Sequence, residues 1–419
     1  MKFKFYLTFT ILTILQLTLS NCASDDNQGD TTVQPKPDPA VEPKPDTEHT
    51  LDLSYKKVIN GKEITQLIKT NDNGFIGIVF SEDYEVIKFD SEFNIVWDKT
   101  YGGSKNDYAQ SILQDKDGNF FVIGHSESSD GDVTNNFGNF DIWLCKIDGS
   151  GNLLWQKNYG GSGYEGINKD HAMIQTSEGG FMFVGYSSSK DHDITNNQGG
   201  MDAWLVKISA IGVIENQKNI GGSIDDYGIK LIKVKNNYVM SVGAQSTDKD
   251  FTGKGQWIFG FSEIGNFIWK KQLNDLNGGT LGSTESGDVL VANSNFTNLS
   301  LYKLDINTGN IKQQKSITLN DPKKKQPSAN RIIESKDNGI IVIGDLGYGN
   351  DEDAMLFRVD SNFNSVVSKF TIGNDYDKSA SIIPVGNDTY VYQIITQSTD
   401  LELKNDQSIA SMILSLKEN

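Results

Sequence analysis

The sequence predicts an all-β protein, and three observations support this class. Glycine is frequent, with 41 copies among 419 residues, and 21 Phe and 15 Tyr accompany it, a composition that favours strands and tight turns. No stretch shows sustained helical periodicity. A glycine-ended apolar strand also recurs along the chain at intervals of 45 to 61 residues. We therefore expect a series of similar β units.

The repeat is clearest in the segments 117–124, 178–185 and 337–344, each of which is a polar turn followed by an apolar strand and a glycine. Aligning all copies on the residue that ends this strand gives seven positions: Val79, Gly124, Gly185, Gly243, Asn293, Gly344 and Ile395. The unit over 277–326 is the poorest copy, which leaves six or eight units as alternatives. Seven units are the prediction.

Each unit holds four expected strands. A short alternating strand such as 109–113 precedes an Asp-Gly or Asn-Gly turn, and the glycine-ended strand follows this turn. A third strand such as 141–148 comes after a polar loop, and a fourth such as 153–157 comes after a Gly/Asn turn. Four-stranded units of this length are typical of β-propeller blades. The sequence thus predicts a single seven-bladed β-propeller over residues 51–419.

The two ends of this region indicate how the ring closes. The last unit stops after its third strand, at 409–416, whereas the segment 53–61 at the start matches a fourth strand and its turn. The N-terminal strand is therefore expected to complete the last blade. Such a closure would cover two exposed sheet edges.

The N-terminus has the features of a targeting segment. Lys2 and Lys4 precede an apolar run over 5–19, which is too short to span a bilayer comfortably. The sequence Leu-Ser-Asn-Cys at 19–22 resembles a bacterial lipobox. This resemblance implies a signal peptide over 1–21 and lipidation of Cys22, with membrane anchoring through the acyl chains. The alternative is an ordinary signal peptide with a cysteine there by chance.

The following segment, 22–50, is expected to be a tether. It is polar and holds five of the eight prolines, which favours an extended, semi-rigid chain. Residues 24–26, Ser-Asp-Asp, resemble the short acidic export signal of Bacteroidetes lipoproteins that are displayed outside the outer membrane. We therefore expect an outer-membrane lipoprotein exposed at the cell surface.

The repeat itself resembles the seven-bladed β-propeller repeat of bacterial secreted proteins and lipoproteins. The likeness rests on Gly-Gly-Ser, Asp-x-Trp-Leu-x-Lys and Trp-x-Lys motifs and is strongest over 101–225. The run Asp-Gly-Ser-Gly-Asn-Leu-Leu-Trp at 148–155 is also similar to that of quinoprotein-type propellers, where the Trp docks neighbouring blades. This implies the same structural role for Trp97, Trp155 and Trp269, but no quinone cofactor. A fold alone does not fix a function.

Two sets of loops are expected on one rim of the propeller: the link from each fourth strand to the next blade, and the loop between the second and third strands. Several of them are unusually rich in Asp, Asn, Ser and Gly, and long loops on a rigid scaffold are the usual place for binding. The predicted ligand-binding residues are Asp107, Asp130, Asp132, Asp141, Asp191, Asp193, Asp202 and Asp226.

A glycan, an envelope protein or Ca²⁺ are the candidate ligands of this rim. Calcium prefers six to eight oxygen ligands, and Asp130, Asp132 and Asn135 with Asp141 could supply several of them. The alternative is that these side chains close turns by bonding to their own backbone. Apart from this possible calcium ion, no metal or other cofactor is predicted.

No catalytic motif was found. The sequence has neither Gly-x-Ser-x-Gly nor His-Glu-x-x-His, and His125, His171 and His192 are isolated and expected to be structural. Cys145 is expected to be a buried small hydrophobe. We predict a non-catalytic binding protein. A role as an accessory subunit of an envelope complex and a polysaccharide hydrolase or lyase that uses an acid pair stay as alternatives.

The net charge and the positions of the tryptophans argue against two classes of ligand site. The chain has 55 acidic and 38 basic residues, a net charge of −17, so nucleic-acid binding is not expected. Trp143, Trp204 and Trp257 occur at one position of the repeat and are expected to pack in the core rather than to form a platform for sugars.

Overall fold

The structure, a computed structural model, describes residues 51–168, 171–273, 279–295, 298–318, 326–347, 352–371, 376–386, 388–397 and 409–418. Every regular element in these ranges is a β-strand, so none of these residues forms a helix that could cross a membrane. The expected signal peptide (1–21), the lipidated Cys22 and the tether (22–50) lie outside the described residues.

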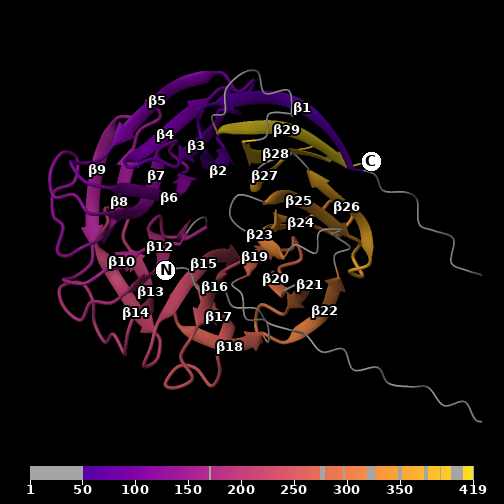
Figure 1. The fold of residues 1–419 in the computed structure, drawn as a ribbon. Helices are drawn as coiled ribbons and strands as arrows, with labels where there is room; N and C mark the ends of the chain where they lie inside the picture. The colour runs from indigo at the N-terminus through magenta and orange to yellow at the C-terminus, as the bar shows by residue number, and fades with distance from the viewer. Residues whose placement is uncertain are drawn as a thin grey trace, which may run out of the picture. The chain divides into compact units, whose positions relative to one another are not determined.

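Seven four-stranded antiparallel sheets surround a central axis, which confirms the predicted seven-bladed propeller (Figure 1). Blade 1 consists of β2 (Ile64–Lys69), β3 (Phe75–Val79), β4 (Tyr84–Phe89) and β5 (Ile95–Tyr101). Blade 2 consists of β6 (Asp107–Gln114), β7 (Phe120–Ser126), β8 (Asp141–Ile147) and β9 (Leu153–Tyr159). Blade 3 has its inner edge in two pieces, β10 (Glu165–Gly166) and β11 (Met173–Gln175), followed by β12 (Phe181–Ser187), β13 (Asp202–Ile208) and β14 (Ile214–Ile220).

The other four blades follow the same order from the axis outward. Blade 4 consists of β15 (Asp226–Val234), β16 (Asn237–Ala244), β17 (Gly255–Phe261) and β18 (Phe267–Leu273). Blade 5 consists of β19 (Thr280–Ser283), β20 (Val289–Asn295), β21 (Asn298–Leu304) and β22 (Ile311–Thr318). Blade 6 consists of β23 (Pro327–Glu334), β24 (Ile340–Leu346), β25 (Asp353–Val359) and β26 (Ser365–Thr371). Blade 7 consists of β27 (Asp377–Gly386), β28 (Thr389–Thr396), β29 (Ala410–Glu418) and β1 (Leu51–Asn60).

The N-terminal strand closes the ring, as the sequence predicted. β1 pairs antiparallel with β29, from Leu51 opposite Glu418 to Asn60 opposite Ala410 (Figure 1). The outermost strand of blade 7 thus comes from the start of the propeller and the other three from its end. This arrangement ties blade 7 to blade 1 through the chain itself.

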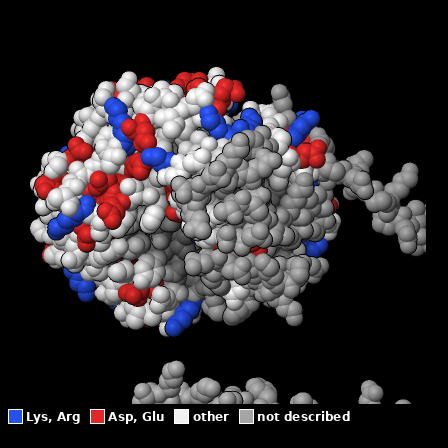
Figure 2. All heavy atoms as spheres, turned by 45° about the horizontal axis from the view of Figure 1, so that its top comes forward, with Lys and Arg blue, Asp and Glu red and all other residues white. Residues whose placement is uncertain are grey.

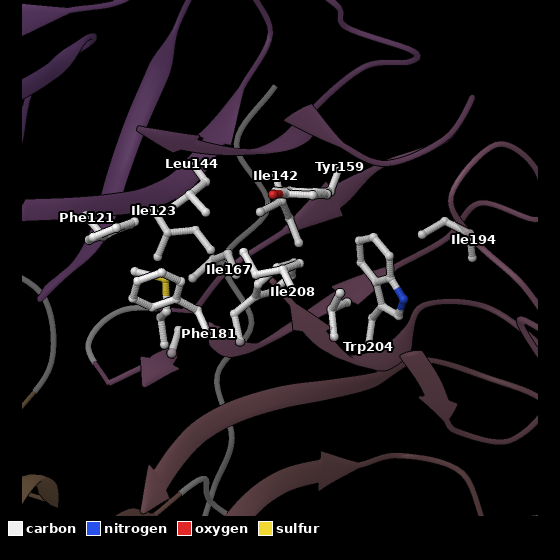
Figure 3. Packing of buried hydrophobic residues seen from close by; sticks show 14 residues of the cluster. Phe121, Ile123, Ile142, Leu144, Tyr159, Ile167, Phe181, Ile194, Trp204 and Ile208 are labelled. Carbon is white, nitrogen blue, oxygen red and sulfur yellow. The ribbon is translucent and has the colours of Figure 1, made fainter. Parts of the chain in front are cut away.

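The apolar second strand of each blade is explained by burial on both faces. In β7, Phe120 and Val122 pack towards blade 1, whereas Phe121 and Ile123 pack towards blade 3. Because neighbouring residues of a strand point to opposite faces, a sheet covered on both sides needs a continuous apolar run. Figure 3 shows the packing between blades 2 and 3, with Trp204 buried as expected.

Among the described residues, seven hydrophobic clusters lie one at each interface between adjacent blades, including that between blades 7 and 1. Trp143, Trp204 and Cys145 are fully buried in them and Trp257 is nearly so. On the outside, the indole N–H groups of Trp97 and Trp269 donate to carbonyls of the next blade, Gly149 at 3.0 Å and Ile306 at 2.7 Å. These contacts provide the docking role that the family resemblance implied.

The innermost strands of blades 1, 2, 4, 6 and 7 have a β-bulge at one repeat position, and in blade 2 the bulge explains the glycine of the second strand. The bulge in β6 lies between Ala109 and Ser111, opposite Gly124. A Cβ on Gly124 would lie 1.9 Å from the carbonyl oxygen of Tyr108, so no side chain fits there. The same bulge turns the residue within it towards the axis in other blades, as at Thr65, Ile229 and Asn330.

Candidate functional site

The two faces of the ring differ in their loops. We call the face with the blade-to-blade links and the loops between second and third strands the loop face, and the opposite face the turn face. Between the two faces, a side-chain contact spans the central axis: His171 of blade 3 contacts the guanidinium of Arg331 in blade 6. The loop face and the turn face therefore have separate openings.

On the loop face, each Gly-Gly-Ser link is held by carboxylates of the following blade. We call this arrangement a latch. In blade 2 three successive amide groups donate to three aspartates: Gly102 N to Asp132 Oδ2 (3.2 Å), Gly103 N to Asp107 Oδ2 (2.7 Å) and Ser104 N to Asp130 Oδ1 (2.8 Å). The hydroxyls of Ser126 and Ser128 also donate to Asp107. The link and the loop between β7 and β8 thus form one unit.

The latch is repeated in blades 3 and 4. The blade 3 contacts are Gly160 N to Asp193 Oδ2 (3.2 Å), Gly161 N to Glu165 Oε2 (2.7 Å) and Ser162 N to Asp191 Oδ1 (2.8 Å). The blade 4 contacts are Gly221 N to Asp250 Oδ2 (3.1 Å), Gly222 N to Asp226 Oδ2 (2.8 Å) and Ser223 N to Asp248 Oδ1 (2.9 Å). Six of the eight predicted binding residues therefore accept main-chain N–H groups of the blade-to-blade links.

These contacts bear on the calcium hypothesis. Asp130 and Asp132 hold the link into blade 2, whereas Asp141 lies against the link into blade 3, where Gly160 meets its carboxylate. The structure thus does not bring the three carboxylates to one place. In the ranges that the structure describes, no group of three or more His, Cys, Asp or Glu side chains is arranged to hold a metal ion.

Asp141 and Asp202, the remaining two predicted residues, occupy equivalent positions at the start of a third strand. Both are fully buried, and each accepts one main-chain N–H on Oδ2, from Phe137 (2.6 Å) and from Gln198 respectively. In both residues Oδ1 is buried without a hydrogen-bond partner. Burial raises the pKa of Asp141 to about 7 and that of Asp202 to about 6.

Asp141 and Glu165 have the chemistry of an acid pair but not the access. The charge of Glu165 contributes to the raised pKa of Asp141, after burial. A protonated acid next to a carboxylate is the arrangement that glycosidases use. Both side chains, however, are completely buried behind the Gly160–Gly161 main chain, so a polysaccharide cannot reach them.

Six aromatic side chains form a continuous arc on the loop face, which we call the aromatic arc. Its centroid-to-centroid contacts are Phe80–Tyr108 (6.4 Å), Tyr108–Phe140 (6.2 Å), Phe140–Tyr164 (5.2 Å), Tyr164–Tyr186 (6.1 Å) and Tyr186–Tyr227 (5.1 Å). Phe80 is 56% exposed and the five others are partly exposed. The aromatic arc runs from blade 1 to blade 4.

His125 lies behind the aromatic arc and contacts Tyr108, Phe140 and Tyr164. It is buried, and its Nδ1 has no hydrogen-bond partner. Burial lowers its pKa to about 4, so the imidazole is neutral at physiological pH. It adds no positive charge to the aromatic arc.

A cavity of about 260 Å³ opens on the loop-face side of the axis, and no ring of the aromatic arc stands on its wall. Glu63, whose carbonyl accepts the amide of Phe80, lies on its wall, as does Ile229, two residues after Tyr227. Lys230 and Lys378 add charge to the wall, and Lys378 pairs with Glu352 at 3.3 Å. The charged groups of the cavity wall thus come from the link into blade 1, from blade 4 and from blade 7, whereas the rings of the aromatic arc lie on blades 1–4.

The turn face has a wider cavity, of about 900 Å³, that the sequence did not predict. Ile174, Ile232 and Leu281 contribute apolar walls. Of its charged groups, Lys336 and Asp388 pair with each other at 2.7 Å. The turns on this face are short, so its opening is wide. The loops of the loop face, in contrast, are held in place by the latches.

The histidines have structural surroundings in the described residues. His125 is enclosed by aromatic rings, His171 contacts Arg331, and His192 stacks on Phe137 with 4.8 Å between ring centroids. The buried thiol of Cys145 has its pKa raised well above the usual value by burial. These groups provide no activated nucleophile.

The aromatic arc was missed in the sequence although a pattern points to it. A tyrosine adjoins the buried acid of each latch: Tyr108 follows Asp107, Tyr164 precedes Glu165, and Tyr227 follows Asp226. Because the acid fixes the start of the innermost strand, its neighbour is turned to the rim. A tyrosine beside that acid in three consecutive blades could have been recognised.

The comparisons with known proteins agree with this fold. No protein-family model matches the sequence, and no curated protein matches it. Among solved structures, the WD40 β-propeller domain of Doa1 is 9% identical with a TM-score of 0.51, covering 86% of this chain and 96% of that one. The propeller of Dos1 is 11% identical with a TM-score of 0.50, covering 84% of this chain and 77% of that one.

A protein of unknown function from Bacteroides caccae is also similar, at 14% identity, with a TM-score of 0.42 and coverage of 74% of this chain and 98% of that chain. At such identities a likeness extends to the fold and not to the ligand. The chain is therefore similar to known β-propellers in its architecture, and the architecture is what these likenesses show.

Proposed function

We propose that this protein is a non-catalytic binding protein that takes its ligand at the loop-face opening. The observation that carries the proposal is the aromatic arc, six partly or largely exposed rings joined end to end on the loop face. Convergent aromatic and polar groups at a concave opening are the usual features of a ligand site. Such a contiguous set of exposed rings on a soluble protein also favours an interaction site.

The latches support the proposal by making the opening rigid. Three amide groups of each link are bound by carboxylates of the following blade, so the links do not need a ligand to order them. A preorganised surface loses less conformational entropy on binding. In this proposal the predicted aspartates act by shaping the rim rather than by touching the ligand with each carboxylate.

We further propose that the protein is a surface lipoprotein anchored to the outer membrane through Cys22, as the lipobox resemblance implies. It would then be of the bacterial seven-bladed propeller repeat type that its motifs resemble. Mass spectrometry of the mature N-terminus tests the anchor. A diacylated or triacylated Cys22 supports it, and an N-terminus cut elsewhere contradicts it.

The binding site is tested with two variants of the C-terminally tagged full chain. Phe80→Ala with Tyr227→Leu removes both ends of the aromatic arc, and Phe267→Ala removes a ring of similar exposure, 46%, on the outermost strand of blade 4. Ligands are sought by glycan array and by affinity capture from cross-linked cells. We expect a ligand that the first variant loses and the second retains. Equal binding by both variants would exclude the aromatic arc.

A further inference from the structure

The links and loops of blades 1 to 4 on the loop face carry an excess of acidic side chains, none of which is in an ion pair within the described residues. The seven segments 80–83, 102–107, 127–141, 160–165, 188–202, 221–226 and 245–254 contain fifteen Asp and Glu residues and four Lys. None of the ion pairs within the described ranges involves any of these fifteen carboxylates. A surface lined by one sign of charge attracts ligands of the opposite sign.

Some acidic side chains outside these segments do take part in ion pairs, as for Lys88 with Asp72 and for Arg358 with Asp337. On the loop face, Lys62 in the link into blade 1 pairs with Glu85 and Asp98. The space-filling view shows Asp and Glu mixed with Lys and Arg over the described surface that faces the viewer (Figure 2). The seven loop-face segments contain eleven more acidic side chains than lysines, fifteen against four.

Asp107 and Asp226 have little hydrogen-bonding capacity left for a neutral ligand, whereas Asp141 and Asp202 each keep one buried oxygen without a partner. Asp107 accepts three hydrogen bonds from the chain itself, and Asp226 accepts amides on both of its oxygens. A sugar hydroxyl would therefore have to displace a main-chain N–H. The charge of a satisfied carboxylate, in contrast, still acts over the Debye length of about 8–10 Å. The face is suited to attract a cation rather than to bind hydroxyls.

The aromatic arc provides the short-range contact that a cation needs. Acidic groups lie next to its rings: Asp225 accepts the hydroxyl of Tyr227 at 3.4 Å, and the charge of Glu127 acts on Tyr164. Ammonium and guanidinium groups are attracted to the faces of such rings.

We propose that the loop-face opening binds a segment of a partner protein that carries Lys or Arg side chains, which are held by the aromatic arc within the negative field of the latched loops. This inference rests on the proposed function, because it names the ligand of the same site. Long apolar stems with a charged end fit rings that lie among carboxylates. Neutral glycans gain nothing from the field, and acidic glycans are repelled by it.

The test uses three fluorescent probes on the full chain: a short Gly/Ser/Lys peptide, the same peptide with acetylated lysines, and a neutral oligosaccharide. We expect the acetylated peptide to bind at least about tenfold more weakly, since it loses the cation–ring and field contributions. Binding of the lysine peptide should fall as salt is raised. Binding should also be lost in the variant Phe80→Ala with Tyr227→Leu.

Two double variants test which acidic side chains contribute to binding of the lysine peptide. Glu82→Gln with Glu127→Gln removes two charges next to the aromatic arc, and Glu92→Gln with Glu285→Gln removes two exposed charges from the turn face. The first pair should weaken the lysine peptide several-fold and the second less than about twofold, because the turn face lies beyond the screening distance.

The outcomes separate the two proposals. Equal affinity for both peptides, or tight binding of the oligosaccharide that depends on the aromatic arc, would overturn the cationic partner and leave the proposed site intact. If instead no probe and no captured ligand distinguishes the Phe80 and Tyr227 variant from Phe267→Ala, both proposals fail.

Discussion

The exposed aspartates of the loop face accept hydrogen bonds from the main chain of the neighbouring link, a contact that the sequence alone does not indicate. Asp130 and Asp191 lie at the surface, yet their pKa values are lowered because each accepts the amide of a serine in the preceding link. Carboxylates at such positions exchange the hydrogen bonds of water for those of the main chain. They are therefore expected to fix the shape of the rim first and to influence a ligand mainly through their charge.

Asp141 predicts how stability depends on pH. Its pKa in the folded state is about 7, well above the ordinary value of 3.8, because burial disfavours the charged form and Glu165 and Asp193 add negative charge. At a pH between these two pKa values, the Asp141 carboxyl is therefore protonated in the folded protein and ionised in the unfolded chain. The free energy of unfolding should therefore rise as the pH falls below about 7, and it should be lowest above that pH.

Urea unfolding from about pH 8 to about pH 5 checks this expectation. The free energy of unfolding should increase on acidification, and Asp141→Asn should make the dependence flatter. Asp117→Asn, in an exposed turn of the same blade, serves as the control. A pH dependence that is unchanged by Asp141→Asn would contradict the assignment.

At the scale of the strand, the repeated motif combines two requirements. The second strand is apolar at every position because both of its faces are covered by neighbouring blades. In blades 2 and 6 its glycine (Gly124, Gly344) is needed because the bulged innermost strand places a carbonyl where a Cβ would stand. In blade 6 the bulge also directs Asn330 to the axis, so the same local distortion that requires glycine contributes to the wall of the loop-face cavity.

Gly124→Ala tests this coupling. The new methyl group would collide with the carbonyl of Tyr108, which must move together with its ring, so we expect a loss of about 1–3 kcal/mol or more in stability. Gly149→Ala in the same blade, where the nearest atom is 3.9 Å away, should change stability by less than about 0.5 kcal/mol. Thermal and urea unfolding of both variants measure the difference.

At the scale of the whole molecule, stability depends on a ring of seven interfaces, one of which is closed by β1. Ile59 at the end of β1 packs with β2 and β3 of blade 1 and with β28 and β29 of blade 7, while Leu51 packs with blade 7. Without β1, the edge of β29 would have no partner strand. Exposed sheet edges of this kind promote association between chains.

Two shortened chains test the closure. A chain that begins at residue 61 lacks β1 and should unfold at least about 5 °C lower than one that begins at residue 51, and it should associate with increasing concentration. Circular dichroism and light scattering measure these effects. Equal unfolding temperatures for the two chains would show that β1 contributes little.

The sequence predicted the blade number and the closure because both depend on a short-range pattern repeated seven times. Burial of Trp143 and Trp204 followed from the same pattern. Contacts between blades did not follow, because the pairing of Asp130 with Ser104 or of Tyr164 with Phe140 depends on how loops from different strands meet. Whether a carboxylate binds a ligand or its own main chain is decided by those contacts.

The antiparallel pairing of β1 with β29 also fixes the face of the propeller on which the start of β1 and the end of β29 lie. Leu51 lies opposite Glu418, whose amide donates to Asp388 in a turn of the turn face, whereas Asn60 leads into the first loop-face link. Anything covalently attached before residue 51 or after residue 418 therefore starts from the side opposite the aromatic arc. A tag or a support attached at either end is therefore joined to the propeller on its turn face.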